Sequence, residues 1–206
     1  MAIEPTVHIV DDDAAIRDSL ALLLRSSGLN AATYPSAEAF LAAAVDGAGC
    51  LVVDVRMPGM GGLALQEELA QRGQRIPVIV VTGHADVALA VRAMKAGALD
   101  FVEKPFDHEA LLGAVRKALD LGIEAARASA QDTEVERRVG LLTPREREVL
   151  DALVAGKPNK IIAHELSISP RTVEIHRSRV MEKMRARTLS EVVRMALSIG
   201  IDGKSA

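Results

Sequence analysis

Polar side chains stand directly after several short apolar runs in the first half of the sequence. They are the acidic triplet Asp11-Asp12-Asp13, then Asp54, Thr82 and Lys104. If these runs are parallel strands, their carboxyl ends meet at one edge of a sheet and the polar side chains converge there. Several carboxylates in one pocket repel each other, and a hard cation such as Mg²⁺ or Mn²⁺ relieves that repulsion.

A carboxylate beside Mg²⁺ can attack phosphorus and form an acyl phosphate. Asp54 is the best candidate for this nucleophile because it follows the middle strand, while Asp11 and Asp12 are better placed to hold the metal. Lys104 can pair with a phosphoryl group and Thr82 can donate a hydrogen bond to it. The bond between Lys104 and Pro105 also invites a cis peptide. Taken one at a time, each residue has an ordinary structural explanation. A loop Asp can cap a helix, Thr82 can be a plain strand residue, and Lys104 can be a solvated surface charge.

The elements that must position these residues alternate between two hydrophobic periods. Five β-branched runs predict strands at residues 7–10, 31–34, 51–53, 78–81 and 99–102. Segments of helical period follow them at residues 16–27, 36–44, 63–72, 87–96 and 110–119. Five βα units in succession predict an α/β fold, a doubly wound five-stranded parallel sheet over residues 1–120, with strand order 2-1-3-4-5.

The rest of the chain contains no credible strand. Residues 121–140 are rich in Ala, Glu and Arg, which favours a solvated helix continuing the helix predicted at residues 110–119, with a disordered linker as the alternative. Residues 141–206 predict a separate all-α domain of four helices, starting at Pro144, Lys160, Pro170 and Val192. The second and third of these form a helix-turn-helix candidate.

Charge is distributed unevenly between these regions. Residues 1–120 carry 10 Lys and Arg against 16 Asp and Glu, a net charge of −6. Residues 141–206 carry 12 against 8, a net charge of +4, which suggests a polyanionic partner for the second region unless the difference arose by chance.

The single cysteine, Cys50, cannot form an internal disulfide, and its apolar neighbours indicate a small core residue. This agrees with a reducing cytoplasm. The first residues lack the pattern of a secretory signal, and no apolar run approaches the length that spans a bilayer. We therefore expect a soluble, cytoplasmic protein without a membrane partner.

The helix expected over residues 170–184 has one apolar face and one polar face. We expect DNA contacts from this face, from the helix start and from the preceding helix, through Lys160, Ser169, Arg171, Thr172, Glu174, Ile175, Ser178 and Arg179. Ile175 points outward and suits a thymine methyl group, while Arg171 and Arg179 suit phosphates or guanine edges. A merely exposed isoleucine is the alternative.

The stretches HIVDDD, VVDVRMPGMGG, VVTGHADV, AMKAGALDF and EKPF resemble the flavodoxin-like receiver domain of two-component response regulators, in its FixJ-type branch. The resemblance implies that Asp54 is the phosphoacceptor and that Asp11, Asp12, Asp54 and the backbone carbonyl of Arg56 bind Mg²⁺. It further implies that Thr82 and Lys104 contact the phosphoryl group and that Phe101 is the switch aromatic. Without the resemblance, Phe101 is simply a core residue. His84 either tunes the phosphate lifetime or is an exposed loop histidine.

The stretches LTPREREVL and GKPNKIIAHELSISPRTVEIHRSRVMEKM resemble the LuxR-type helix-turn-helix of the NarL and FixJ regulators. The resemblance places the recognition helix at residues 170–184. It implies dimerisation through the last helix, which offers Val192, Met195, Ala196 and Ile199. The alternative is that this stripe only closes the domain core. Where many such helices carry Lys or Val, this one has Glu174 and Ile175, so no relative's target sequence can be transferred.

These features together predict a response regulator and transcriptional activator. A sensor histidine kinase phosphorylates Asp54, the chain dimerises, and the pair binds a two-fold symmetric DNA site beside RNA polymerase. An Mg²⁺-dependent phosphatase is a weaker alternative, because such enzymes usually carry a second Asp close after the nucleophile and position 56 is Arg56. An adaptor whose C-terminal helices recruit protein is another. We predict that the chain is not an enzyme.

Overall fold

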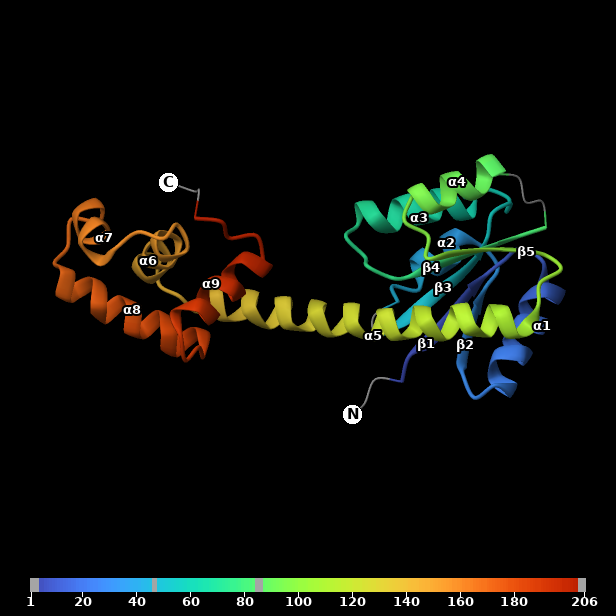
Figure 1. Ribbon diagram of the computed structural model, residues 1–206, viewed down its shortest axis with the longest axis horizontal. Helices are drawn as coiled ribbons and strands as arrows, with labels where there is room; N and C mark the ends of the chain where they lie inside the picture. The colour runs from blue at the N-terminus through green and yellow to red at the C-terminus, as the bar shows by residue number, and fades with distance from the viewer. Residues whose placement is uncertain (1–3, 46–47, 84–86, 204–206) are drawn as a thin grey trace. The chain divides into compact units, whose positions relative to one another are not determined.

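In the computed structural model of the chain, five β-branched runs pair as one parallel sheet (Figure 1). The strands are β1 (Thr6–Val10), β2 (Asn30–Tyr34), β3 (Gly49–Asp54), β4 (Val78–Thr82) and β5 (Asp100–Glu103). Their order is β2-β1-β3-β4-β5, which confirms the predicted strand order. The structure describes residues 4–45, 48–83 and 87–203.

Helices cover both faces of this sheet, which is the doubly wound arrangement that the βα alternation predicts (Figure 1). The first four are α1 (Ala14–Ser26), α2 (Ala37–Ala42), α3 (Gly62–Gln71) and α4 (Val87–Lys95). Helices α1 and α5 (His108–Val139) pack on one face, around Ile9 and Val52. Helices α2, α3 and α4 pack on the other face, around Val10 and Val53. Cys50 is fully buried in the first of these cores, and burial raises the pKa of its thiol to about 12.

Helix α5 is much longer than the segment 110–119 predicted for the sheet domain. It continues without interruption to Val139, so the predicted helical linker 121–140 lies almost entirely inside it. The chain divides into two units within this helix, Met1–Arg127 and Ala128–Ala206. Each unit has its own hydrophobic core. Within the described residues, no helix combines the length and the apolar character that crossing a membrane requires.

The second unit is all-helical, as predicted. It contains the end of α5 and then α6 (Pro144–Val154), α7 (Asn159–Glu165), α8 (Pro170–Met184) and α9 (Leu189–Ser198). A capping box at Thr143 begins α6 at the predicted Pro144, because the Thr143 hydroxyl accepts from the amide of Glu146 while the Glu146 carboxylate accepts from the amide of Thr143. Helix α9 begins at Leu189 rather than at the predicted Val192, since Thr188 caps it directly.

Candidate functional site

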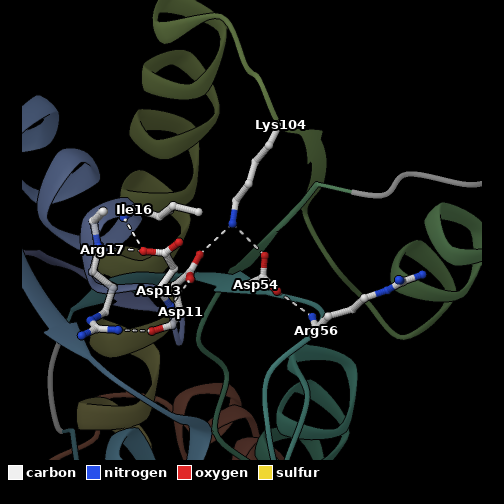
Figure 2. Close-up of polar contacts among 8 residues, drawn as sticks. Asp11, Asp13, Ile16, Arg17, Asp54, Arg56 and Lys104 are labelled. Carbon is white, nitrogen blue, oxygen red and sulfur yellow. Dashed lines mark hydrogen bonds and ion pairs between the residues drawn. The ribbon is translucent and has the colours of Figure 1, made fainter.

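The predicted polar cluster assembles at the carboxyl edge of the sheet. Val10 pairs with Val53 in the register of β1 and β3, so Asp11 comes level with Asp54. Both aspartates are buried, and so is Thr82 at the end of β4. Lys104 follows β5, and its side chain extends to a point between Asp11 and Asp54 (Figure 2). Four residues from separate parts of the sequence therefore lie at one edge of the sheet, which we call the acidic pocket.

The ammonium group of Lys104 connects the two buried carboxylates. Its Nζ lies 2.7 Å from Oδ2 of Asp11 and 2.8 Å from Oδ1 of Asp54 (Figure 2). Burial lowers the pKa of Lys104, but the hydrogen bonds and charges of Asp11 and Asp54 outweigh burial and hold this pKa above its ordinary value. Lys104 is therefore the cation that compensates the two acids.

Asp54 is oriented by its own loop as well as by Lys104. The backbone amide of Arg56 donates to Oδ2 of Asp54 at 2.6 Å. The loop then passes close behind the strand, because a Cβ atom on Gly62 would lie 2.3 Å from the carbonyl oxygen of Asp54. Only glycine permits this approach of α3 to the strand end. Both oxygens of Asp54 thus have defined hydrogen-bond donors.

The three consecutive aspartates have three different environments. Asp11 is buried and accepts from the amide of Asp13 through Oδ1 at 2.9 Å. Asp12 is exposed. Asp13 is the N-cap of α1, and its carboxylate accepts from the amides of Ala15 and Ile16. The helix-cap alternative is therefore correct for Asp13, which was not among the predicted metal ligands.

The backbones of Thr82 and Lys104 are joined at this edge. The amide of Lys104 donates to the carbonyl of Thr82 at 2.7 Å, and the bond between Lys104 and Pro105 is cis, as the sequence suggested. Phe101 on β5 pairs with Val80, is partly buried and packs against the core beneath α2, α3 and α4. His84 lies outside the described residues.

Mg²⁺ prefers oxygen ligands, and the carboxylates at this edge of the sheet are candidates for such ligands. Among the described residues, no three acidic or metal-binding side chains gather closely enough to hold an ion on their own. Mg²⁺ nevertheless binds proteins through one or two carboxylates and retains several waters. Asp11 and Asp54 supply such oxygens, and the ammonium of Lys104 between them marks a place that favours a cation. The donor set fits Mg²⁺.

Arg17 is a residue of this region that the sequence interpretation missed. Its Nη1 donates to the carbonyl oxygen of Asp11 at 2.6 Å, on the side of the backbone away from Lys104 (Figure 2). Its position four residues after the cap Asp13 was visible in the sequence. The contact depends on how the turn folds, which residue spacing does not specify.

In the second unit, α8 has one apolar face and one polar face. Val173, Val180 and Met184 are fully buried. The opposite face leaves five predicted DNA contacts exposed, namely Arg171, Glu174, Ile175, Ser178 and Arg179. Ser169 caps the helix by accepting from the amide of Thr172 at 3.0 Å, and Lys160 is exposed on α7. A helix with a free polar face follows a short helix, which is the helix-turn-helix arrangement.

The stripe on α9 closes the core of the unit. Val192 and Ala196 have no exposed surface, and Met195 and Ile199 pack against the same core. The stripe therefore closes the core of its own domain, which was the alternative to dimerisation. Val192 and Ala196 have no exposed surface with which to contact a second copy. The exposed large apolar residues of α9 are Leu189, at 39% exposure, and Leu197, at 52%.

Both units match known protein families. Residues 7–116 match the response regulator receiver domain, and residues 140–196 match the bacterial regulatory proteins of the luxR family. The class of protein is therefore a transcriptional response regulator, with a receiver followed by a LuxR-type DNA-binding domain. The fold and the acidic pocket of the first unit agree with this class.

The relatives identify the family more narrowly. The chain is 55% identical over 196 residues to the transcriptional regulatory protein FixJ of Azorhizobium caulinodans, across 95% of this chain and 93% of that protein. It is 51% identical over 197 residues to FixJ of Rhizobium meliloti, across 95% of this chain and 96% of that protein. The chain belongs to the FixJ family of response regulators.

Solved structures of full-length regulators are also similar. A low-resolution structure of the response regulator StyR gives a TM-score of 0.74 at 42% identity, covering 94% of this chain and 98% of that one. Full-length FixJ from B. japonicum gives a TM-score of 0.56 at 44% identity, covering 97% and 99%. These similarities extend over both units.

Proposed function

We propose that Asp54 accepts a phosphoryl group from a sensor histidine kinase, and that this change promotes dimerisation and binding to a two-fold symmetric DNA site. The observation that carries the proposal is the bridge from Lys104 to Asp11 and Asp54. The proposed nucleophile Asp54, a second acid and a cation thus lie together at the ends of three strands. A phosphoryl group needs such a neutralising environment.

The chemistry requires little of the protein beyond orientation. One carboxylate oxygen of Asp54 attacks phosphorus, and the new O–P bond forms as the N–P bond of the kinase phosphohistidine breaks. The departing imidazole takes up a proton and leaves neutral. Lys104 exchanges a carboxylate partner for a phosphoryl oxygen, and the amide of Arg56 keeps the other oxygen of Asp54 in place.

The proposed metal site uses the same edge of the receiver. Asp11, Asp12, Asp54 and the backbone carbonyl of Arg56 would hold Mg²⁺ or Mn²⁺. When bound, the cation neutralises charge on the phosphoryl oxygens. Asp11 is already fixed by the amide of Asp13, whereas Asp12 is exposed and free to turn toward an ion.

We propose that Thr82 and Phe101 transmit the effect of phosphorylation from the acidic pocket to the receiver surface. Thr82 is buried beside the pocket, and Phe101 lies on the neighbouring strand at the core next to α4. A movement of the Thr82 hydroxyl toward the phosphoryl group would leave space that Phe101 can enter. Phosphorylation then biases a surface with two packing states, which is how a local charge controls a distant contact.

DNA recognition is proposed for the exposed face of α8. Arg171 is an exposed cation near the start of α8, Arg179 is an exposed cation about two turns further along, and Ile175 is 47% exposed between them. This arrangement suits phosphate or guanine contacts on either side of an apolar contact. A dimer would present two such helices to half-sites about one helical turn apart. Activation of transcription would then require contact with RNA polymerase.

The test is phosphotransfer from a small-molecule donor to wild type and Asp54→Asn, with and without Mg²⁺. Wild type should be labelled only with the cation, and Asp54→Asn should not be labelled. Equal labelling of both proteins would exclude Asp54 as the acceptor. Turnover of a phosphate ester that Asp54→Asn abolishes would instead support the phosphatase alternative.

A further inference from the structure

Arg17 contacts the acidic turn twice. Its backbone amide donates to the carbonyl of Asp13 at 3.0 Å, as the first turn of α1 requires. Its side chain donates through Nη1 to the carbonyl of Asp11 at 2.6 Å (Figure 2). A hydrogen bond from a charged donor is among the stronger ones, and the Arg17 contact is partly buried. The side chain of Arg17 therefore links α1 to the backbone that directly follows β1.

This contact fixes the peptide unit between Asp11 and Asp12. The other polar groups of Asp11 also have defined partners, since its amide donates to the carbonyl of Tyr34 and its carboxylate accepts from Asp13 and Lys104. Holding the carbonyl of Asp11 sets the backbone direction from which the side chain of Asp12 emerges. Asp12 is the exposed member of the proposed metal site, so its orientation depends most on the backbone.

We propose that Arg17 is a positioning residue for the metal site, which it serves by holding the peptide between Asp11 and Asp12. The inference rests on the proposed function, because it assigns Arg17 a role in a site that the proposed function requires. Arg17 itself touches neither the metal nor the phosphoryl group. It acts through the backbone of the two acids that do.

Two physical effects predict opposite results for the loss of this side chain. Arg17 is a cation near an acidic pocket, so electrostatics alone predicts that its removal strengthens Mg²⁺ binding. If Arg17 positions the peptide, its removal should instead weaken Mg²⁺ binding, because the peptide that it no longer holds must be ordered when the ion binds. Loss of a group that orients metal ligands typically weakens metal binding by about 10–100-fold. The sign of the change therefore separates positioning from simple charge.

The experiment is a calorimetric titration of the full chain with Mg²⁺ alone, without a phosphoryl donor. Arg17→Met keeps the length of an unbranched stem but has no donor, and we expect it to bind Mg²⁺ about tenfold more weakly than wild type. Arg17→Lys retains a charged donor and should recover most of the affinity. Arg25→Ala is the matched control, because Arg25 also lies on α1 and donates to a backbone carbonyl, that of Ala31, away from the pocket.

Thermal unfolding without Mg²⁺ distinguishes positioning from a purely structural role. If Arg17→Met lowers the melting temperature but binds Mg²⁺ as tightly as wild type, or more tightly, the inference is wrong. If Arg17→Met does not fold, the Arg17→Lys titration decides, and an affinity above that of wild type overturns the inference. A wild-type chain that binds no Mg²⁺, or an Asp54→Asn chain that is still labelled, contradicts the proposed function itself.

Discussion

At the scale of single residues, one cation holds the acidic pocket together. Lys104 bridges two buried carboxylates that belong to different strands. Its side chain is only 16% exposed, so solvent screens the bridge less than it screens a surface ion pair. Removal of the cation leaves two buried acids without a partner of opposite charge, and such uncompensated buried charge destabilises a fold.

Lys104→Met should therefore lower the free energy of unfolding of the receiver by about 1–3 kcal/mol in the absence of metal. Excess Mg²⁺ should stabilise this variant more than it stabilises wild type, because the ion then compensates charge that Lys104 no longer does. Urea unfolding with and without Mg²⁺ measures both effects. Lys117→Met, which removes an exposed lysine from α5, should change neither quantity.

His8 gives the receiver a pH dependence. It is 6% exposed, its Nδ1 lies 3.1 Å from the hydroxyl of Tyr34, and its ring packs against the rings of Tyr34 and Phe40. Burial lowers the pKa of His8 below its ordinary value of 6.5. The unfolded chain therefore binds the proton more readily than the folded chain, and stability falls as the pH drops below 6.5.

His8→Phe removes this group while keeping an aromatic ring. Wild type should lose stability relative to His8→Phe as the pH falls from neutral toward 5, by at most about 1.4 kcal/mol per pH unit. Denaturant unfolding of both proteins across this range provides the comparison. Parallel curves for the two proteins would show that His8 is not the group responsible.

The sequence predicted the reacting residues better than the residues that orient them. Asp54, Thr82 and Lys104 each follow a strand, and strand ends in a parallel sheet must meet, so their convergence follows from the hydrophobic pattern. The contacts of Arg17 and of the Arg56 amide arise from the conformation of two tight turns. Residue type and spacing do not fix such conformations.

At the scale of elements, α6 and α8 are joined by a partly buried ion pair. Glu146 on α6 is 1% exposed, and Nζ of Lys183 on α8 lies 2.6 Å from its Oε2. Burial raises the pKa of Glu146, but hydrogen bonds from Lys183 and Thr143 outweigh it and hold this pKa below its ordinary value. The carboxylate thus serves the helix cap and the orientation of the recognition helix at once.

Glu146→Gln should destabilise the DNA-binding unit by about 1–3 kcal/mol, since Lys183 loses its charged partner and the capping box is altered. Glu148→Gln is the control, because Glu148 forms only an exposed pair with Arg145 on the same helix. Denaturant unfolding measures both variants. Equal effects would mean that the burial of Glu146 contributes nothing.

In the second unit, the local sequence pattern predicts where helices begin but not which surface an apolar face contacts. The capping box at Thr143 and the helix Pro170–Met184 were predictable because caps and proline specify a start. The burial of Val192 and Ala196 was not, because an apolar stripe does not reveal whether it faces its own core or a second copy. Tertiary packing decides that question.

At the scale of the whole molecule, α5 contributes to two cores. Leu111, Val115 and Ala118 are buried in the receiver, while Val135 and Val139 are buried in the DNA-binding unit. Arg138 also donates to the carbonyl of Met184 at the end of α8. The last turns of α5 thus form part of the DNA-binding fold rather than a passive tether.

Val139→Ala should accordingly destabilise the DNA-binding unit by about 2 kcal/mol while leaving the receiver unchanged. Hydrogen exchange resolved along the chain distinguishes the two units in one experiment. Val91→Ala on α4 replaces a valine that is 45% exposed, so it should leave both units nearly unaffected. A loss of protection in the receiver of Val139→Ala would mean that the two units do not unfold separately.

We propose that phosphorylation of Asp54 controls DNA binding by the second unit. The most direct measurement is the salt-dependent affinity of the full chain for its DNA site, before and after treatment with a phosphoryl donor and Mg²⁺, for wild type and Asp54→Asn. We predict that phosphorylation increases the affinity of wild type and its apparent size together, and that Asp54→Asn responds in neither measurement. An equal response from Asp54→Asn would contradict the claim.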